Sequence, residues 1–173
     1  NSAALGIDIL GDGVTLNDTG DADNGPNSGI NFPVITSSYI GGTTLTVRGW
    51  ARPGATIEWF LTDINEGSAA AGDNQLGMVT DYGEGQIYLG TSTEGSASDL
   101  DGTSSYYIDE DGNTDTTNNF HFEVTIPSGL QANDLITSTA TIGNSTSEFS
   151  PFSVVRIPTL ITNRRITYRV KKN

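Results

Sequence analysis

The stretch Phe120-His121-Phe122-Glu123-Val124-Thr125-Ile126 alternates apolar and polar side chains without interruption. Successive side chains of a β-strand point to opposite faces, so this pattern predicts a strand with one face in a core and the other in water. No stretch of about 11 residues keeps an apolar stripe at helical spacing. Further strand patterns lie at 32–40, 44–50, 57–61, 86–91, 135–142 and 149–157. The sequence therefore predicts an all-β fold, an antiparallel β-sandwich of about seven short strands.

The amino-acid composition excludes several classes of function. The 173 residues include 21 Asp and Glu against 8 Lys and Arg, no cysteine, and His121 as the one histidine. Neutralising phosphates requires Lys and Arg, so a nucleic-acid partner is excluded for the acidic body. No run of about 18 apolar residues occurs, and we expect no transmembrane segment. Without cysteine, a second histidine or a Gly-x-Ser-x-Gly motif, the sequence predicts a protein that is not an enzyme.

The charge is divided sharply along the chain. Residues 1–155 hold all 21 acidic residues and two basic ones, a net charge of minus 19, whereas residues 156–173 hold six basic residues and no acidic one. Together with the polar run at 11–29, this shift predicts three parts. They are an amino-terminal region with an acidic Gly/Asp loop (1–30), the sandwich (31–157) and a basic tail (158–173).

The tail alternates apolar and basic side chains, which is typical of a strand. Two interpretations are open. In the first, the tail is a closing edge strand or an interdomain linker that docks on the acidic body. In the second, its Lys and Arg contact a partner or an anionic surface polysaccharide.

The acidic loop Asn17-Asp18-Thr19-Gly20-Asp21-Ala22-Asp23-Asn24-Gly25-Pro26-Asn27 is the most site-like stretch. Calcium takes six to eight oxygen ligands, and glycines between carboxylates let a short loop fold its oxygens inward. We therefore predict calcium ligands at Asp18, Asp21, Asp23 and Asn27. The loop departs from the EF-hand pattern, because no Glu closes it at the twelfth position. The alternative is a solvated turn, since Asp and Gly are common turn residues.

Two connections, 62–85 and 92–118, are long for a compact domain. Both are rich in Gly, Ser, Asp and Asn, so they are either mobile surface loops or loops ordered by a cation or ligand. Asp63 and Glu84 bracket the first loop and are candidate ligands of a second calcium ion. Tyr82, Tyr106 and Tyr107 lie in or beside these loops and are candidates for stacking on sugars.

Several segments together resemble one arrangement in large bacterial surface proteins. Residues 1–9, 11–15 and 18–27 resemble the junction where the last coil of a right-handed parallel β-helix gives way to an immunoglobulin-like module. Phe32-Pro33-Val34-Ile35-Thr36 is similar to the first strand of that module. Its later parts resemble residues 82–85, 88–90, 118–120, 139–141 and 145–150.

This resemblance covers about residues 1–155 and implies an immunoglobulin-like sandwich in an extracellular, secreted or cell-surface protein of a Bacteroidetes-type bacterium, exported by type 9 secretion. It supplies no catalytic residues, and the tail lacks a complete sorting-domain pattern. We expect a structural or adhesive module stabilised by calcium. Its expected partners are neighbouring domains of the same polypeptide, surface polysaccharide or the secretion machinery. The alternative is a carbohydrate-binding module appended to a polysaccharide-degrading enzyme, with the loop tyrosines as its sugar platform.

Overall fold

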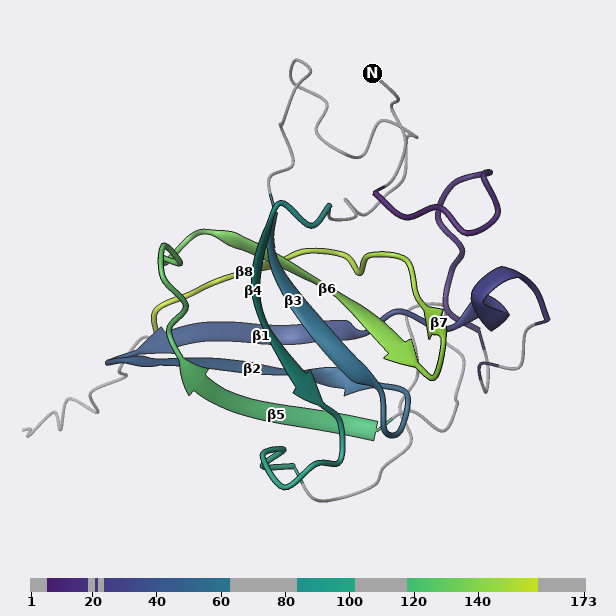
Figure 1. Cartoon of the computed structure of the whole chain (residues 1–173). Coiled ribbons are helices and arrows are strands. Elements are labelled where there is room, and N and C mark those ends of the chain that lie inside the picture. Colours follow the sequence, from purple (N-terminus) through teal and green to yellow (C-terminus); the bar gives the residue numbers. More distant parts are fainter. Residues whose placement is uncertain (1–5, 19–20, 22–23, 63–83, 102–117, 159–173) are drawn as a thin grey trace, which may run out of the picture.

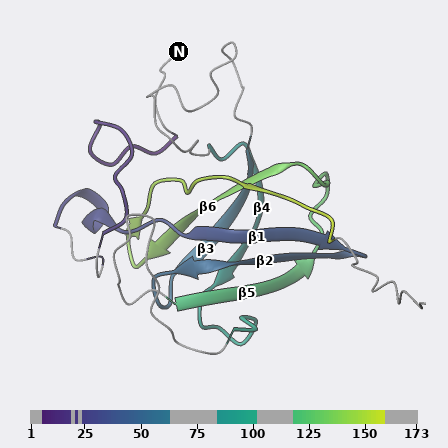
Figure 2. The same cartoon turned by 180° about the vertical axis from the view of Figure 1, so that it is seen from behind.

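The computed structural model describes residues 6–18, 21, 24–62, 84–101 and 118–158. Figure 1 shows two β-sheets stacked face to face, with the strands of one sheet crossing those of the other. The same two layers are seen from behind in Figure 2. The described part is almost entirely β, with one short 3₁₀ segment, η2 (Pro26–Gly29). The predicted all-β sandwich is therefore confirmed.

The first sheet has three antiparallel strands in the order β1-β2-β5. They are β1 (Val34–Gly41), β2 (Thr44–Ala51) and β5 (Asn118–Thr125). The β1–β2 register shifts between Ile35 and Ser37, so Thr36 forms a bulge on the strand that ends this sheet. Such a bulge interrupts the ladder and redirects its side chains.

The second sheet has the order β4-β3-β6-β7, and β8 also pairs with β6. Its pairings are antiparallel, and β6 coincides with the predicted strand at 135–142. The bounds are β3 (Thr56–Thr62), β4 (Ile87–Thr93), β6 (Leu135–Ile142), β7 (Ser145–Thr146) and β8 (Ser153–Val154).

The core lies between the two sheets. Trp59 of β3 packs edge-on against Phe120 and Phe122 of β5, with ring centroids 5.4 and 6.1 Å away. Its indole N–H donates to Ser92 Oγ at 3.1 Å. The two phenylalanines share one parity of the segment that opened the sequence analysis, and both are buried. The alternating pattern thus correctly predicted which face of β5 enters the core.

One predicted strand is wrong. The pattern at 149–157 predicted a continuous strand, but the structure has the two-residue β8 there, with isolated bridges at Pro151 and Arg156. Beside β6, backbone bonds and serine hydroxyls alternate: the N–H groups of Ser147 and Ser150 donate to the carbonyls of Ala140 and Ser138. The amide N–H of Ser138 donates to Ser150 Oγ, and that of Ala140 donates to Ser147 Oγ. Two residues lie between these serines but only Thr139 lies between their partners on β6, so the chain bulges there and the regular ladder is interrupted.

Candidate functional site

The acidic loop is closed by side chains that bind backbone groups. Asn17 is fully buried; its amide Nδ2 donates to the Phe32 carbonyl at 2.9 Å, and its Oδ1 accepts the Phe32 amide N–H at 2.9 Å. The side chain thus makes the pair of bonds that a neighbouring strand would make. Both polar ends of the amide are satisfied, which a buried amide requires. We call this pair of bonds, together with those of Asn31 and Asp21 below, the loop clasp.

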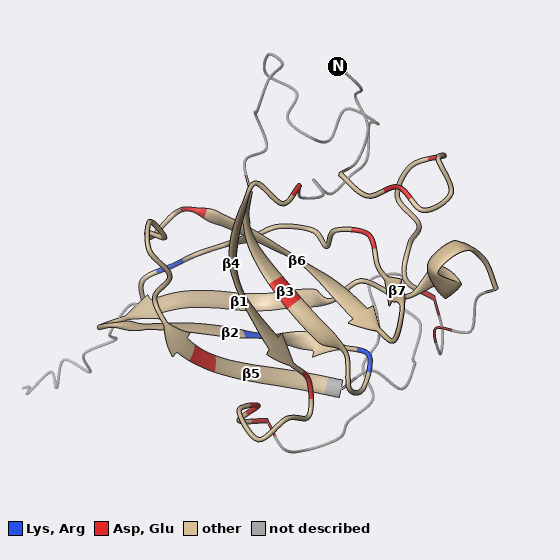
Figure 3. Ribbon diagram, viewed as in Figure 1, with Lys and Arg blue, Asp and Glu red and all other residues tan. Residues whose placement is uncertain are grey.

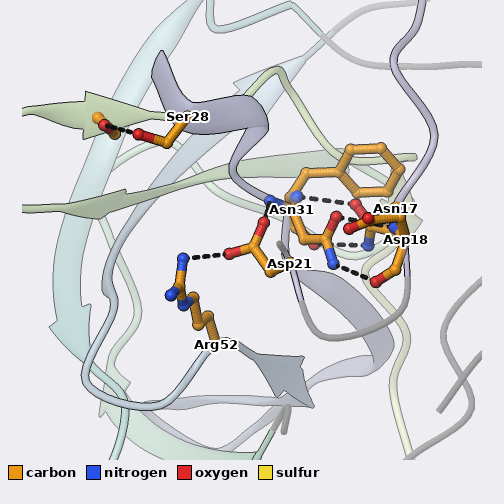
Figure 4. A network of polar contacts seen from close by, with 8 residues as sticks. Asn17, Asp18, Asp21, Ser28, Asn31 and Arg52 are labelled. Carbon is orange, nitrogen blue, oxygen red and sulfur yellow. Dashed lines mark hydrogen bonds and ion pairs between the residues drawn. The ribbon is translucent and has the colours of Figure 1, made fainter. Parts of the chain in front are cut away.

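Asn31 repeats the arrangement in the opposite direction. Its Oδ1 accepts the Asp18 amide N–H at 2.9 Å, and its Nδ2 donates to the Asp18 carbonyl at 2.8 Å. Its own backbone N–H donates to Oδ1 of Asp21 at 2.7 Å. Figure 4 shows these side chains converging between the amino-terminal segment and the start of the sandwich. The clasp therefore joins the two ends of the acidic loop directly to each other.

Arg52 completes the clasp from the turn after β2. Its guanidinium lies 2.6 Å from Oδ2 of Asp21, whose side chain is 2% exposed (Figure 4). A charged hydrogen bond of this kind is short and strong, and removing one partner would leave the other charge buried alone. The carboxylate of Asp21 is therefore occupied on both oxygens by protein donors.

The structure describes three of the four predicted calcium ligands of the acidic loop, Asp18, Asp21 and Asn27, and calcium binding by this loop stays a prediction. Both oxygens of Asp21 are engaged, one by a cation, and Asn27 is exposed in η2. Within the described ranges, no group of three His, Cys, Asp or Glu side chains gathers at metal-binding distance. Figure 3 likewise shows acidic residues spread over loops and strands. Asp23 lies outside the described residues.

The other predicted site residues are placed only in part. Glu84 is described: its backbone N–H donates to Thr62 Oγ1 at 3.1 Å, and its side chain lies beside Gly6. Asp63, Tyr82, Tyr106 and Tyr107 lie outside the described residues. The second calcium site and the sugar platform therefore stay predictions.

Glu148 forms a second anchor that the sequence analysis did not identify. The residue is 2% exposed, and its carboxylate accepts three hydrogen bonds. Oε1 accepts the Ile9 N–H at 2.9 Å and the Thr15 hydroxyl at 3.2 Å, and Oε2 accepts the Thr15 N–H at 2.8 Å. No local sequence signal could have revealed these partners, because they lie more than 130 residues away along the chain.

The segment held by Glu148 is itself shaped by Asp8. The Asp8 carboxylate accepts the backbone N–H groups of Gly11, Asp12 and Gly13, at 2.6, 3.2 and 3.2 Å. Gly11 and Gly13 have φ angles of 73° and 109°, which side chains strongly disfavour. Asp8 thus folds residues 8–13 into a turn, and Ile9 at its start and Thr15 just after it donate to Glu148.

Burial raises the pKa of Glu148 above its ordinary value of 4.5. The hydrogen bonds from Ile9 and Thr15 oppose this shift without cancelling it, and the charge of Asp8 adds to it. The folded protein therefore binds the Glu148 proton more tightly than the unfolded chain does.

We predict a pH dependence that Glu148→Gln removes. Because the pKa is raised on folding, the contribution of Glu148 to stability is fully present below pH 4.5 and is lost as the pH rises through the folded pKa. The difference in unfolding free energy between wild type and Glu148→Gln should therefore shift against the wild type as the pH rises. Urea unfolding of both proteins at several pH values measures it. A constant difference would contradict the prediction.

We also predict that Asn17→Asp destabilises the protein. The new carboxylate can accept the Phe32 N–H, but it cannot donate to the Phe32 carbonyl, and a charge is buried. The expected loss of unfolding free energy is at least about 2 kcal/mol. Asn27→Asp makes the same chemical change at an exposed position and should have almost no effect. Equal unfolding midpoints for the two variants in urea would show that the Asn17 bonds contribute nothing.

No family model matches this sequence. Within the described residues, no helix is long and apolar enough to cross a membrane.

Proposed function

We propose that this chain is a non-enzymatic, immunoglobulin-like module on the bacterial exterior, and that its task is structural. In this proposal the sandwich holds the segment that precedes it in one fixed direction, as a spacer or adhesive unit of a longer polypeptide requires. Its main partner is then the neighbouring part of the same chain.

One observation supports the proposal: the buried carboxylate of Glu148 accepts its hydrogen bonds from Ile9 and Thr15. Burying a carboxylate is costly unless hydrogen bonds satisfy it. A buried carboxylate at this position would not stabilise the sandwich if the sandwich did not bind the amino-terminal segment. The loop clasp adds further buried polar bonds between the amino-terminal segment and the first strand. Fixing residues 6–18 on the sandwich is the role that explains both features.

The strand order supports the immunoglobulin-like part of the proposal. Three strands, β1-β2-β5, face a sheet built on β4-β3-β6 with β8 beside β6. The chain after β8 then crosses to the first sheet and bridges β1 in parallel at Tyr39 and Arg156. In constant-type immunoglobulin domains one sheet has the order 1-2-5-4 and the other 3-6-7, so the neighbours 1-2-5 and 3-6 are the same in both.

Calcium enters the proposal through the predicted ligands, of which Asp23 and Asp63 lie outside the described ranges and Asp18, Asp21, Asn27 and Glu84 lie within them. Thermal melting with and without a chelator tests this part separately. If calcium stabilises the module, the melting temperature rises in millimolar calcium by mass action, and the rise is lost in Asp23→Asn. An unchanged melting temperature removes calcium from the proposal and leaves the structural role intact.

The structural role is tested by NMR relaxation on the whole chain. In the wild type, amides of residues 6–18 should be as ordered as those of β3, with order parameters of about 0.85. In Glu148→Ala, those of residues 9–15 should fall below about 0.6, while β3 stays rigid. Glu94→Ala is the matched control, because Glu94 is also buried but binds the Gly54 N–H at another turn.

Two results would end this proposal. Disorder of residues 6–18 in the wild type would show that the sandwich does not fix this segment, and equal loss of order in both variants would show only general destabilisation.

The location is tested by protease digestion of intact producing cells. A module that is cleaved only after lysis would not be on the exterior.

A further inference from the structure

A groove of about 620 Å³ runs beside β1, at the edge of the three-stranded sheet. Residues 35–39 of β1 line one wall, and residues 152–154 and 156–158 line the other. Ligand sites in proteins commonly measure about 300–1,000 Å³, so the groove has the size of a binding site. Neither the loop clasp nor the Glu148 anchor uses it.

Hydrogen bonds between the two walls hold the groove in shape. Ser38 Oγ lies 2.8 Å from Ser153 Oγ and 3.2 Å from the Val154 carbonyl. Farther along, the Arg156 N–H donates to the Ser38 carbonyl at 3.0 Å, and the Ile40 N–H donates to the Arg156 carbonyl at 2.8 Å. A ligand would therefore meet walls that are already ordered, which lowers the entropic cost of binding.

The groove contains a cation in an acidic protein. Of the three arginines in the described ranges, Arg52 is paired with Asp21, whereas no ion pair is formed by Arg156, which lines the groove and is exposed. A guanidinium presents a planar fork that matches a carboxylate. Arg156 is also the first residue of the basic carboxyl-terminal stretch and the one basic residue of that stretch that is described. The groove thus offers an anion a specific partner.

The remaining lining includes aromatic residues and residues with hydroxyl groups. Tyr39 and Phe152 supply aromatic surface, and Thr36, Ser37 and Ser153 supply hydroxyl groups. Aromatic rings can pack against the C–H face of a sugar while hydroxyls exchange hydrogen bonds with its edge. A peptide added as a further strand fits less well, because the bulge at Thr36 interrupts the β1 ladder where the groove lies.

We propose that this groove binds an acidic saccharide, with the sugar carboxylate paired to Arg156 and the ring packed against the aromatic lining. The inference goes beyond the structural role proposed above and does not depend on it. It also gives the basic stretch a specific role at its first residue.

The test is calorimetric titration of the whole chain with trigalacturonate, using the fully methyl-esterified trisaccharide as the neutral control. We expect binding of the acid and none of the ester. Arg156→Gln should weaken binding at least about tenfold, whereas Arg48→Gln, which removes an arginine outside the groove, should leave it unchanged. The Arg156 bridge to β1 uses only backbone atoms, so the substitution leaves that bridge in place.

NMR provides a second measurement that needs no variant. Titration of the wild type should shift the amide signals of Tyr39 and Ser153 more than those of β3. The proposal is overturned if no binding occurs at about 10 mM trigalacturonate. It is equally overturned if acid and ester bind alike, if both arginine variants lose binding alike, or if the shifting signals lie away from the groove.

Discussion

Trp59→Ala is expected to lower the free energy of unfolding by about 3–5 kcal/mol, which is the cost of removing a large buried aromatic side chain. Trp59 is 5% exposed and packs edge-on against both Phe120 and Phe122. Its removal would leave a cavity between the two sheets and also deprive Ser92 of its indole donor. Urea unfolding followed by circular dichroism measures the loss.

Trp59→Phe separates packing from the hydrogen bond. The phenyl ring keeps part of the contact with the β5 phenylalanines but loses the N–H bond to Ser92, so its cost should lie well below that of alanine. If the two variants unfold at the same denaturant concentration, the interlocked rings do not hold the two sheets together as we infer.

Gly49→Ala is expected to cost about 3 kcal/mol or more, although it adds only a methyl group. A Cβ at Gly49 would overlap the backbone carbonyl oxygen of Val34 and lie 2.5 Å from Cζ of Phe120. Gly49 pairs with both Ile35 and Phe120 in the centre of the three-stranded sheet. Because one obstacle is backbone, relief requires β1 and β2 to separate.

Gly41→Ala is the matched control in the same sheet. A Cβ at Gly41 would meet nothing within 4 Å, and its backbone φ is not positive. Alanine there should be neutral or slightly stabilising, since it restricts the unfolded chain more than glycine does. Comparable melting temperatures for Gly49→Ala and Gly41→Ala would refute the steric argument.

Most strands could be predicted from the sequence, because the alternation of apolar and polar side chains is visible among neighbouring residues. Phe120 and Phe122 entered the core on the expected parity, and β6 has the predicted bounds. The strand predicted at 149–157 is reduced to β8, and the chain before it bulges where the hydroxyls of Ser147 and Ser150 accept β6 amide bonds. Serine in a strand pattern does not reveal whether its hydroxyl will replace a backbone group.

The candidate site was predicted only in part, for a different reason. The acidic loop was correctly singled out as unusual, yet its chemistry depends on Arg52 and Phe32, which lie beyond the loop. The segment around Asp21 predicts a calcium ligand, and it could not reveal the contact with Arg52, which lies 31 positions away. Glu148 could not have been found at all, since its donors come from the opposite end of the described chain.

The large sequence separation between Glu148 and its donors also predicts the order in which parts of the chain fold. Ile9 and Glu148 are separated by 139 positions, so their bond closes a loop that includes every strand from β1 to β7. Long-range contacts of this kind form late, because the chain entropy lost in closing the loop is repaid only once the intervening strands have paired. During synthesis the amino-terminal segment emerges first, but its anchor emerges among the last residues of the domain. We therefore expect the amino-terminal segment to dock on Glu148 only after these strands have folded.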